Sequence, residues 1–169
     1  RTVSSAASDV YKRQLLESNV KDEERHDLAL SYVADAHGLD DKAEREAKLL
    51  RDAWIAHPDH TILKALVAER AVFFVILPFN RFCGDAALRT VSADISRDEQ
   101  IHVACNSLVC ADMGLRPSSS LDKLRKATIN WIFEPLTTTA TNKYLNRKFW
   151  TDSSDRLMYE GKAPQLADT

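Results

Sequence analysis

The stretch ILKALVAERAVFFVILPFNRF, from Ile62 to Phe82, decides the fold because it is apolar almost all round, as a helix at the centre of a bundle is. Asp59 precedes it as the expected N-cap residue, and Pro78 predicts a kink near its end. Glu69 is a lone acid within the apolar part of this run. The run therefore predicts a central helix with one buried carboxylate.

The segments on either side of this run also show helical periodicity. Apolar residues recur at intervals of three and four, which predicts further helices at residues 15–36, 42–56, 88–113 and 121–144. The second of these is highly charged and is expected to be more exposed, and Pro135 predicts a break in the last. Only 4 Gly and 5 Pro among 169 residues leave few turn-forming positions, which excludes an all-β fold. We expect an all-α helical bundle.

The overall charge is close to balanced and points to no charged partner. The chain has 23 basic and 25 acidic residues, so nucleic-acid binding is not indicated. Three cysteines, Cys83, Cys105 and Cys110, are too few for a secreted disulfide framework and are expected to be buried thiols. Because no segment is long and apolar enough for a membrane span, we expect a cytoplasmic protein without a membrane partner.

The two ends of the chain are expected to lie outside the bundle. Asp9-Val-Tyr-Lys-Arg-Gln14 looks like the translation of a transposon end used in sequencing libraries. Residues 1–14 are therefore interpreted as an adapter-derived scar, with the natural protein beginning upstream of Leu15. From residue 147 to 169 the chain is polar and loses its period, which predicts a solvated tail. The domain itself is expected to comprise residues 15–146.

Two short motifs carry metal-binding chemistry. Glu23 and His26, and again Glu99 and His102, stand three residues apart on predicted helices, so each pair lies on one helical face and can hold one metal ion. Both pairs fall on apolar seams, where an ionised carboxylate is costly unless a cation compensates it. With Glu69 they match the pattern of a carboxylate-bridged di-iron or di-manganese helical bundle.

Each of these features also has a simpler explanation. A single Glu-x-x-His motif on an amphipathic helix is usually a surface pair, and Glu69 could be paired with an arginine from a neighbouring helix. The joint occurrence of both motifs and the buried acid on inward faces favours the metal site.

The local sequence resembles a known family at two places. Ile95-Ser-Arg-Asp-Glu-Gln-Ile-His102 resembles a signature of the small, radical-generating subunit of class I ribonucleotide reductase, which has a ferritin-like fold. Glu69-Arg-Ala-Val-Phe-Phe74 is similar to the Glu-x-x-x-Phe-Phe helix of that family. The resemblance covers residues 15–113 well and the remainder only loosely.

This resemblance implies a set of residue roles. Five of six metal ligands would be Glu23, His26, Glu69, Glu99 and His102. Asp98 would hydrogen-bond His26 and belong to the radical-transfer path, and Phe73 and Ile95 would line the pocket beside the metals. The sixth ligand, an acid on a preceding helix, has no counterpart, as expected if the N-terminal part is missing. The cofactor would be a dinuclear centre, Mn/Fe, Mn/Mn or Fe/Fe.

The comparison with the family is limited at the two positions where the family carries a functional tyrosine. The usual place of the radical tyrosine is occupied by Leu30, so the oxidising equivalent would reside on the metals themselves, which favours manganese somewhat. Tyr32 is expected to point away from the ligand face. In the tail, Tyr159 is the best candidate for the relay tyrosine to the large subunit, although most tyrosines in polar tails are merely solvated.

The expected function is therefore that of the small subunit of ribonucleoside-diphosphate reductase. It would supply an oxidising equivalent to a large subunit, its partner, and is expected to form a homodimer. One alternative is another ferritin-like dimetal oxidase or oxygenase with its own substrate. Another is a metal-free helical interaction module.

Overall fold

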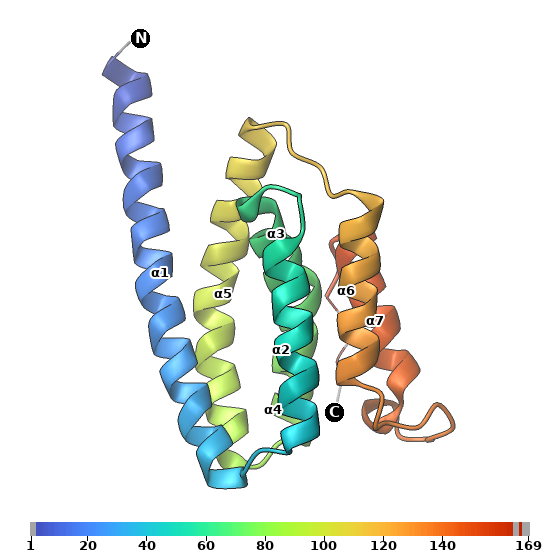
Figure 1. The fold of residues 1–169 in the computed structure, drawn as a ribbon. Coiled ribbons are helices and arrows are strands. Elements are labelled where there is room, and N and C mark those ends of the chain that lie inside the picture. Colours follow the sequence, from blue (N-terminus) through green and yellow to red (C-terminus); the bar gives the residue numbers. More distant parts are fainter. Residues whose placement is uncertain (1–2, 164–165, 167–169) are drawn as a thin grey trace.

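The computed structural model describes residues 3–163 and 166, with side chains from residue 13 onward (Figure 1). Every element named in this part of the chain is a helix, which confirms the expected all-α bundle. The elements are α1 Val3–His37, α2 Asp41–Ala56, α3 Thr61–Ala68, the π-helical turn η1 Glu69–Phe73, α4 Phe74–Cys83, α5 Ala86–Asp112, α6 Ser119–Ile132, the 3₁₀ turn η2 Lys143–Leu145 and α7 Arg147–Glu160. None of the described helices is long and apolar enough to cross a membrane.

Local sequence signals begin and end most of these helices. Asp40, Asp85 and Ser118 cap α2, α5 and α6, because each side chain accepts a hydrogen bond from a backbone N–H in the first turn. After α1 and α5 the chain turns at Gly38 and Gly114, whose φ angles of 78° and 65° lie in the left-handed region that glycine adopts without strain.

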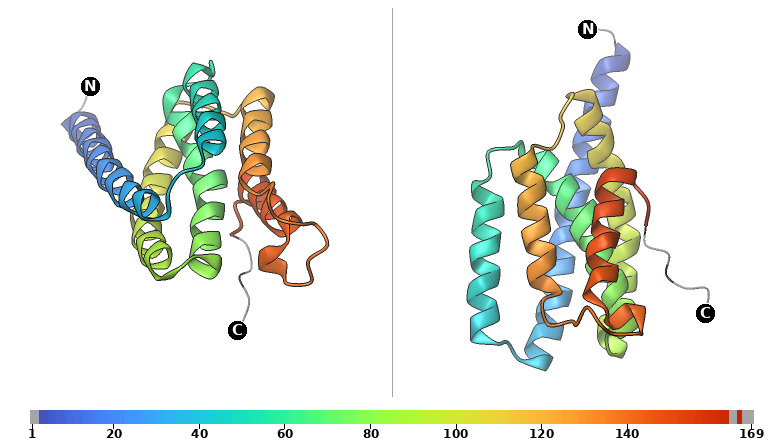
Figure 2. Two further views of the ribbon diagram at one scale, coloured as in Figure 1. Left: turned by 60° about the horizontal axis from the view of Figure 1, so that its bottom comes forward. Right: turned by 90° about the vertical axis from the view of Figure 1, so that its right-hand side faces the viewer.

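Helix α5 lies at the centre of the half of the bundle that carries the candidate site. Helix α1 packs on one side of α5, and the continuous run α3–η1–α4 packs on the other (Figures 1 and 2). Helices α6 and α7 lie on the far side of η1, and α2 packs against α6. The run from Thr61 to Cys83 is therefore the central helix that its apolar sequence predicts.

The hydrophobic core lies on the side of the central helix away from α1. One cluster joins η1 and α4 to α6 and α7, and its buried members are Ala71, Val72, Val75, Ile129, Phe133, Trp150 and Leu157. A second joins α3, α5 and α6 through Leu63, Leu66, Val67, Cys110 and Leu121. At the π-turn, by contrast, the central helix meets α5 through a polar contact between Glu69 and Asn106.

The structure corrects the prediction of a solvated tail for residues 147–160. These residues form α7, which Asn146 caps and which ends at Gly161, where φ is 66°. Trp150 and Leu157 are buried in the core, together with Ser153 and Ser154 on the same side. The stripe that α7 buries is narrow and half of it is serine, so the segment has polar composition although it packs tightly. Residues 164–165 and 167–169 of the predicted tail, and residues 1–2 of the predicted scar, lie outside the described residues.

The structure also refines three smaller expectations. Helix α6 ends at Ile132, which confirms the break predicted at Pro135, but the segment does not resume as the same helix toward Tyr144. The cap of α3 is His60, whose Nδ1 accepts from the Ile62 N–H, whereas Asp59 accepts from the Ser118 N–H and joins this turn to the start of α6. Cys105 and Cys110 are buried as expected, but Cys83 is exposed.

The predicted apolar seam of α1 is only partly covered. Val20 is 60% exposed and Leu30 40% exposed, because α5 is the one described element against which α1 packs substantially. Among residues 13–37, His26 is the one fully buried side chain. Apolar surface of α1 is therefore left exposed among the described residues.

Candidate metal centre

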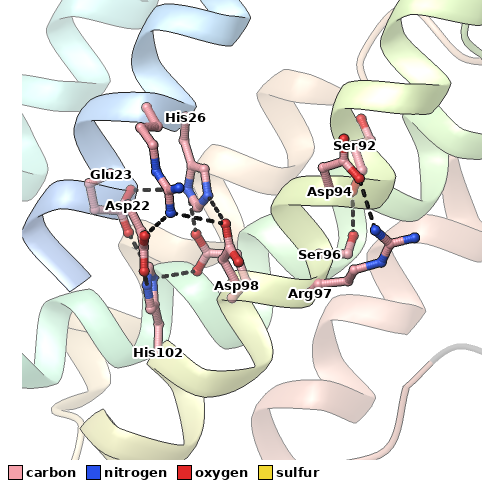
Figure 3. A network of polar contacts seen from close by, with 11 residues as sticks. Asp22, Glu23, His26, Ser92, Asp94, Ser96, Arg97, Asp98 and His102 are labelled. Atoms are coloured by element: carbon pink, nitrogen blue, oxygen red, sulfur yellow. Dashed lines mark hydrogen bonds and ion pairs between the residues drawn. The ribbon is translucent and has the colours of Figure 1, made fainter. Parts of the chain in front are cut away.

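The candidate centre lies where three helical elements meet. Helix α1 supplies Glu23 and His26, the π-turn η1 supplies Glu69, and α5 supplies Glu99 and His102. The spacing of three within each Glu-x-x-His motif places both of its side chains on the face of its helix that meets the other (Figure 3). The predicted convergence of these five residues from separate parts of the chain is thus observed.

Four of the five residues form a tight group of potential ligands. One ligand atom each from Glu23, Glu69, Glu99 and His102 lies within 4.8 Å of all the others. A metal separation of 3.5–4 Å in two-metal sites, bridged by carboxylates, needs donor atoms at such distances. His26 borders the group, with Nδ1 at 3.2 Å from Glu99 Oε1 and 3.8 Å from Glu23 Oε2.

The two histidines are held in the same way by the opposite helix. His26 Nε2 lies 3.0 Å from Asp98 Oδ2, which confirms the contact that the family resemblance implies. His102 Nε2 lies 3.3 Å from Asp22 Oδ2. Each aspartate directly precedes the glutamate of the motif on its own helix, so the two contacts cross between α1 and α5 (Figure 3). Both imidazoles therefore direct Nδ1 toward the carboxylates, as a carboxylate–histidine–metal arrangement requires.

Asn106 holds Glu69 from the third side. Its amide nitrogen donates to both carboxylate oxygens of Glu69, at 2.8 and 3.1 Å. Asn106 lies one turn beyond His102 on α5, and both side chains of the pair are buried. The alternative that Glu69 pairs with an arginine is therefore wrong, because its recorded side-chain partner is a neutral amide.

Burial changes the proton affinity of this group. Desolvation raises the pKa of Glu69 to about 7, against the opposing hydrogen bond from Asn106. Desolvation and the charge of Glu23 raise the pKa of Glu99 to about 7. Desolvation acts to lower the pKa of His102, but the hydrogen bond to Asp22 and the charges of Glu99 and Glu23 raise it overall. In the metal-free protein, protons bound to these side chains therefore compensate part of the buried negative charge.

The unpaired atoms of the site fit a metal ion. Both carboxylate oxygens of Glu99 and the Nδ1 atom of His26 are buried without a hydrogen bond. A buried polar atom without a partner is costly and rare in native proteins. These three atoms belong to expected ligands, and carboxylate oxygen with imidazole nitrogen is a donor set suited to iron or manganese. A bound cation would give them partners, whereas Asn106 Oδ1 and Ser92 Oγ, which are also unpaired, are not expected ligands.

Some predicted residues lie elsewhere or are less enclosed than expected. Ile95 is buried as the resemblance implies, but Phe73 is 38% exposed and lines an apolar groove of about 600 Å³ together with residues of α2 and α6. Glu23 is 46% exposed at its side chain, so the site is open on the α1 side. Tyr32 is 66% exposed, in agreement with its predicted outward direction.

Tyr159 lies on α7 rather than in a solvated tail. Its side chain is 59% exposed, and its hydroxyl donates to Asp122 Oδ2 at 2.5 Å. The cations of Arg125 and Lys126 lie over its ring, at 5.6 and 5.3 Å from the centroid. Tyr159 is thus a fixed part of the α6–α7 surface.

Sequence reasoning missed Asp22 and Asn106. Asp22 had a usable signal, because the full pattern Asp-Glu-x-x-His occurs twice, at residues 22–26 and 98–102. Given the expected role of Asp98, the repeat predicts the same role for Asp22. Asn106 had no such signal, since an asparagine on an inward seam has many possible partners.

Comparison with protein-family models, curated proteins and solved structures finds no match to this chain.

Proposed function

We propose that this chain holds a dinuclear iron or manganese centre and acts as the small subunit of a class I ribonucleotide reductase. The observation that carries the metal centre is the convergence of Glu23, Glu69, Glu99 and His102 within 4.8 Å, from three separate elements. The resemblance of Ile95–His102 to the family signature supports the particular enzyme class. The family's ferritin-like fold is part of this proposal, and its buried ligands on long helices are compatible with the bundle described here.

Two bound metal ions, once oxidised by an external oxidant, would supply a one-electron oxidising equivalent for the large subunit. The residues of this chain fix the geometry around them. Glu69 and Glu99 would hold the cations with buried carboxylates, and His26 and His102 would each contribute an imidazole nitrogen. Asp98 and Asp22 accept from the Nε2–H groups and so orient Nδ1 of each ring toward the carboxylates that would share the metal.

The chain offers no tyrosine at the position one turn beyond His26, where Leu30 stands. The oxidising equivalent is therefore expected to stay on the metals, which favours manganese with iron or two manganese ions over a plain di-iron centre. Electron paramagnetic resonance of the activated protein checks this. We expect a broad signal with manganese hyperfine structure. A narrow organic radical that persists in Tyr32→Phe and accounts for activity would contradict it.

Tyr159 is the proposed relay tyrosine toward the large subunit. Oxidation of a tyrosine releases the phenolic proton, and the carboxylate of Asp122 already accepts that proton's hydrogen bond at 2.5 Å. Tyr159→Phe is expected to abolish ribonucleotide reduction while metal loading stays intact. Tyr32→Phe, which removes an exposed hydroxyl on α1, is the matched control. Unchanged turnover in Tyr159→Phe would exclude the relay role.

The proposal implies a homodimer, a tightly bound large subunit and a cytoplasmic location. The three cysteines are free in the structure, as suits a reducing compartment. The test is to load the chain with iron and manganese and to add a class I large subunit from the same source. We expect co-purification and reduction of ribonucleoside diphosphates. A metal-loaded chain that neither binds the large subunit nor supports reduction would point to another dimetal oxidase, and a chain without metal to a helical interaction module.

A further inference from the structure

The π-turn η1 is held by α7 on the side opposite the candidate metal centre. Ser154 of α7 is fully buried, and its hydroxyl donates to the backbone carbonyl of Ala71 at 2.5 Å. Ala71 lies within the π-turn, two residues after Glu69. A side chain that bonds a backbone carbonyl within a helix is one of the features that accompany local changes of helical geometry.

A buried arginine fixes the direction of this hydrogen bond. Arg125 of α6 donates from one terminal nitrogen to Ser154 Oγ at 2.9 Å and to Asp155 Oδ1 at 2.7 Å, and from the other to Asp122 Oδ1 at 2.5 Å. A guanidinium has no acceptor, so Ser154 must accept from it and has its single proton left for Ala71. Arg125 is almost fully buried, and the two aspartates compensate its charge.

The π-turn thus has a polar anchor on each side. Ser154 bonds the backbone at Ala71, while Asn106 of α5 bonds the carboxylate of Glu69. Because a π-turn adds a residue to the helical turn, it sets the direction of Glu69 relative to the rest of the central helix. A restraint on the backbone of this turn is a restraint on where the Glu69 carboxylate lies.

We propose that Ser154, held by Arg125, is a positioning residue that fixes the π-turn and thereby places Glu69 at the metal centre. The effect of Ser154 on metal binding rests on the proposed metal centre. Its restraint on the backbone of the π-turn can be measured without metal. The chain contains a close control for it. Ser153 is also buried on α7, yet its hydroxyl donates to Phe149 O within its own helix.

The experiment compares Ser154→Ala with Ser153→Ala and the wild-type chain. Mn²⁺ binding is measured by electron paramagnetic resonance, and amide hydrogen exchange is measured for residues 72–75 in the metal-free proteins. We expect Ser154→Ala to bind Mn²⁺ about tenfold more weakly, with an altered line shape of the bound signal, and to exchange faster in the π-turn. Ser153→Ala should match the wild type in both measurements. Restoring the hydroxyl with Ser154→Thr should recover the line shape.

The outcomes separate the two proposals. If the wild type binds Mn²⁺ and Ser154→Ala binds it equally well, or if both serine variants lose affinity equally, Ser154 is not a positioning residue. If the wild type binds no Mn²⁺, the metal centre fails and the exchange rates alone decide the restraint. Equal exchange in the two serine variants would then overturn it.

Discussion

At the scale of single residues, the most unusual feature is the burial of two glutamates beside one another, with no lysine or arginine paired to either among the described residues. The nearest imidazole nitrogens to Glu99 are His26 Nδ1 at 3.2 Å and His102 Nδ1 at 3.5 Å. Glu69 contacts a neutral amide, and the oxygens of Glu99 have no hydrogen bond at all. In the metal-free protein both pKa values rise to about 7, because burial disfavours the ionised form. The arrangement is costly for folding alone, and the proposed cations would compensate the buried charge.

This burial predicts how the stability of the metal-free protein depends on pH. The folded-state pKa of Glu69, about 7, lies above its unfolded value, so the stabilising protonated form is fully present at low pH and is lost as pH rises toward and through 7. Glu69→Gln removes this loss. In chelator, we expect the stability difference in favour of the variant to be larger at pH 8 than at pH 4 by about 2–3 kcal/mol, because pH 4 lies below both pKa values of Glu69. Urea unfolding measures the difference, and a pH-independent difference would contradict the account.

The orientation of His26 by Asp98 predicts a second effect. Asp98→Asn keeps the size of the side chain but removes the charge that holds Nε2–H, so metal affinity should fall by about ten- to a hundredfold. Asp94→Asn on the same helix is the control, because Asp94 pairs only with exposed Arg97 at 3.1 Å. Isothermal titration with Mn²⁺ gives both affinities. Equal affinity in the two variants would rule out this role of Asp98.

The ligand residues could be predicted from the sequence because their chemistry is tied to spacing. A glutamate and a histidine three apart on a helix share one face whatever surrounds the helix. The contacts of Asn106 and Ser154 depend instead on which helices meet, and Asn and Ser pair with many groups. Such contacts become visible only once the tertiary arrangement is known.

At the scale of elements, α7 shows where reasoning from periodicity fails. Its buried stripe consists of Trp150, Ser153, Ser154 and Leu157, so only two of four inward positions are apolar. The serines satisfy their hydroxyls at backbone carbonyls and allow close packing. The π-turn could not be predicted from the sequence either, because the run around it is apolar on all sides and shows no change of period.

Trp150 is the residue that holds α7 in the core. Its ring stacks with Phe133 at 5.7 Å and meets Phe79 and Phe149 edge-on, and its indole N–H donates to Tyr144 O at 2.9 Å. Trp150→Ala should lower the free energy of unfolding by about 3–5 kcal/mol. Lys148→Ala, at an exposed position of the same helix, should change it by less than about 0.5 kcal/mol. A loss below about 1 kcal/mol in Trp150→Ala would mean that α7 is not part of the core.

At the scale of the whole molecule, the larger apolar cluster and the candidate centre lie on opposite sides of the central helix. That cluster joins the central helix to α6 and α7, whereas α1 is held to α5 with His26 as its one buried side chain among residues 13–37. The candidate centre therefore lies at the contact through which α1 joins the bundle. A metal bound to Glu23 and His26 would link α1 to the rest of the molecule.

This arrangement predicts that metal loading protects α1 more than α7. Amide exchange of residues 20–33 should slow by at least tenfold when Mn²⁺ is added, since binding to the folded state stabilises it by mass action. Exchange in α7, which is held by the apolar core, should change little. Equal protection of both helices, or none, would contradict the proposed role of the site.

The number of metal ions bound per chain tests the central claim most directly. The chain is loaded with Fe²⁺ or Mn²⁺ under anaerobic conditions, passed through a desalting column and analysed for metal and protein content. The account predicts two ions per wild-type chain, and a loss of bound metal in Glu99→Gln, because that carboxylate is the most buried of the group. A wild-type chain that retains no more metal than Glu99→Gln would contradict it.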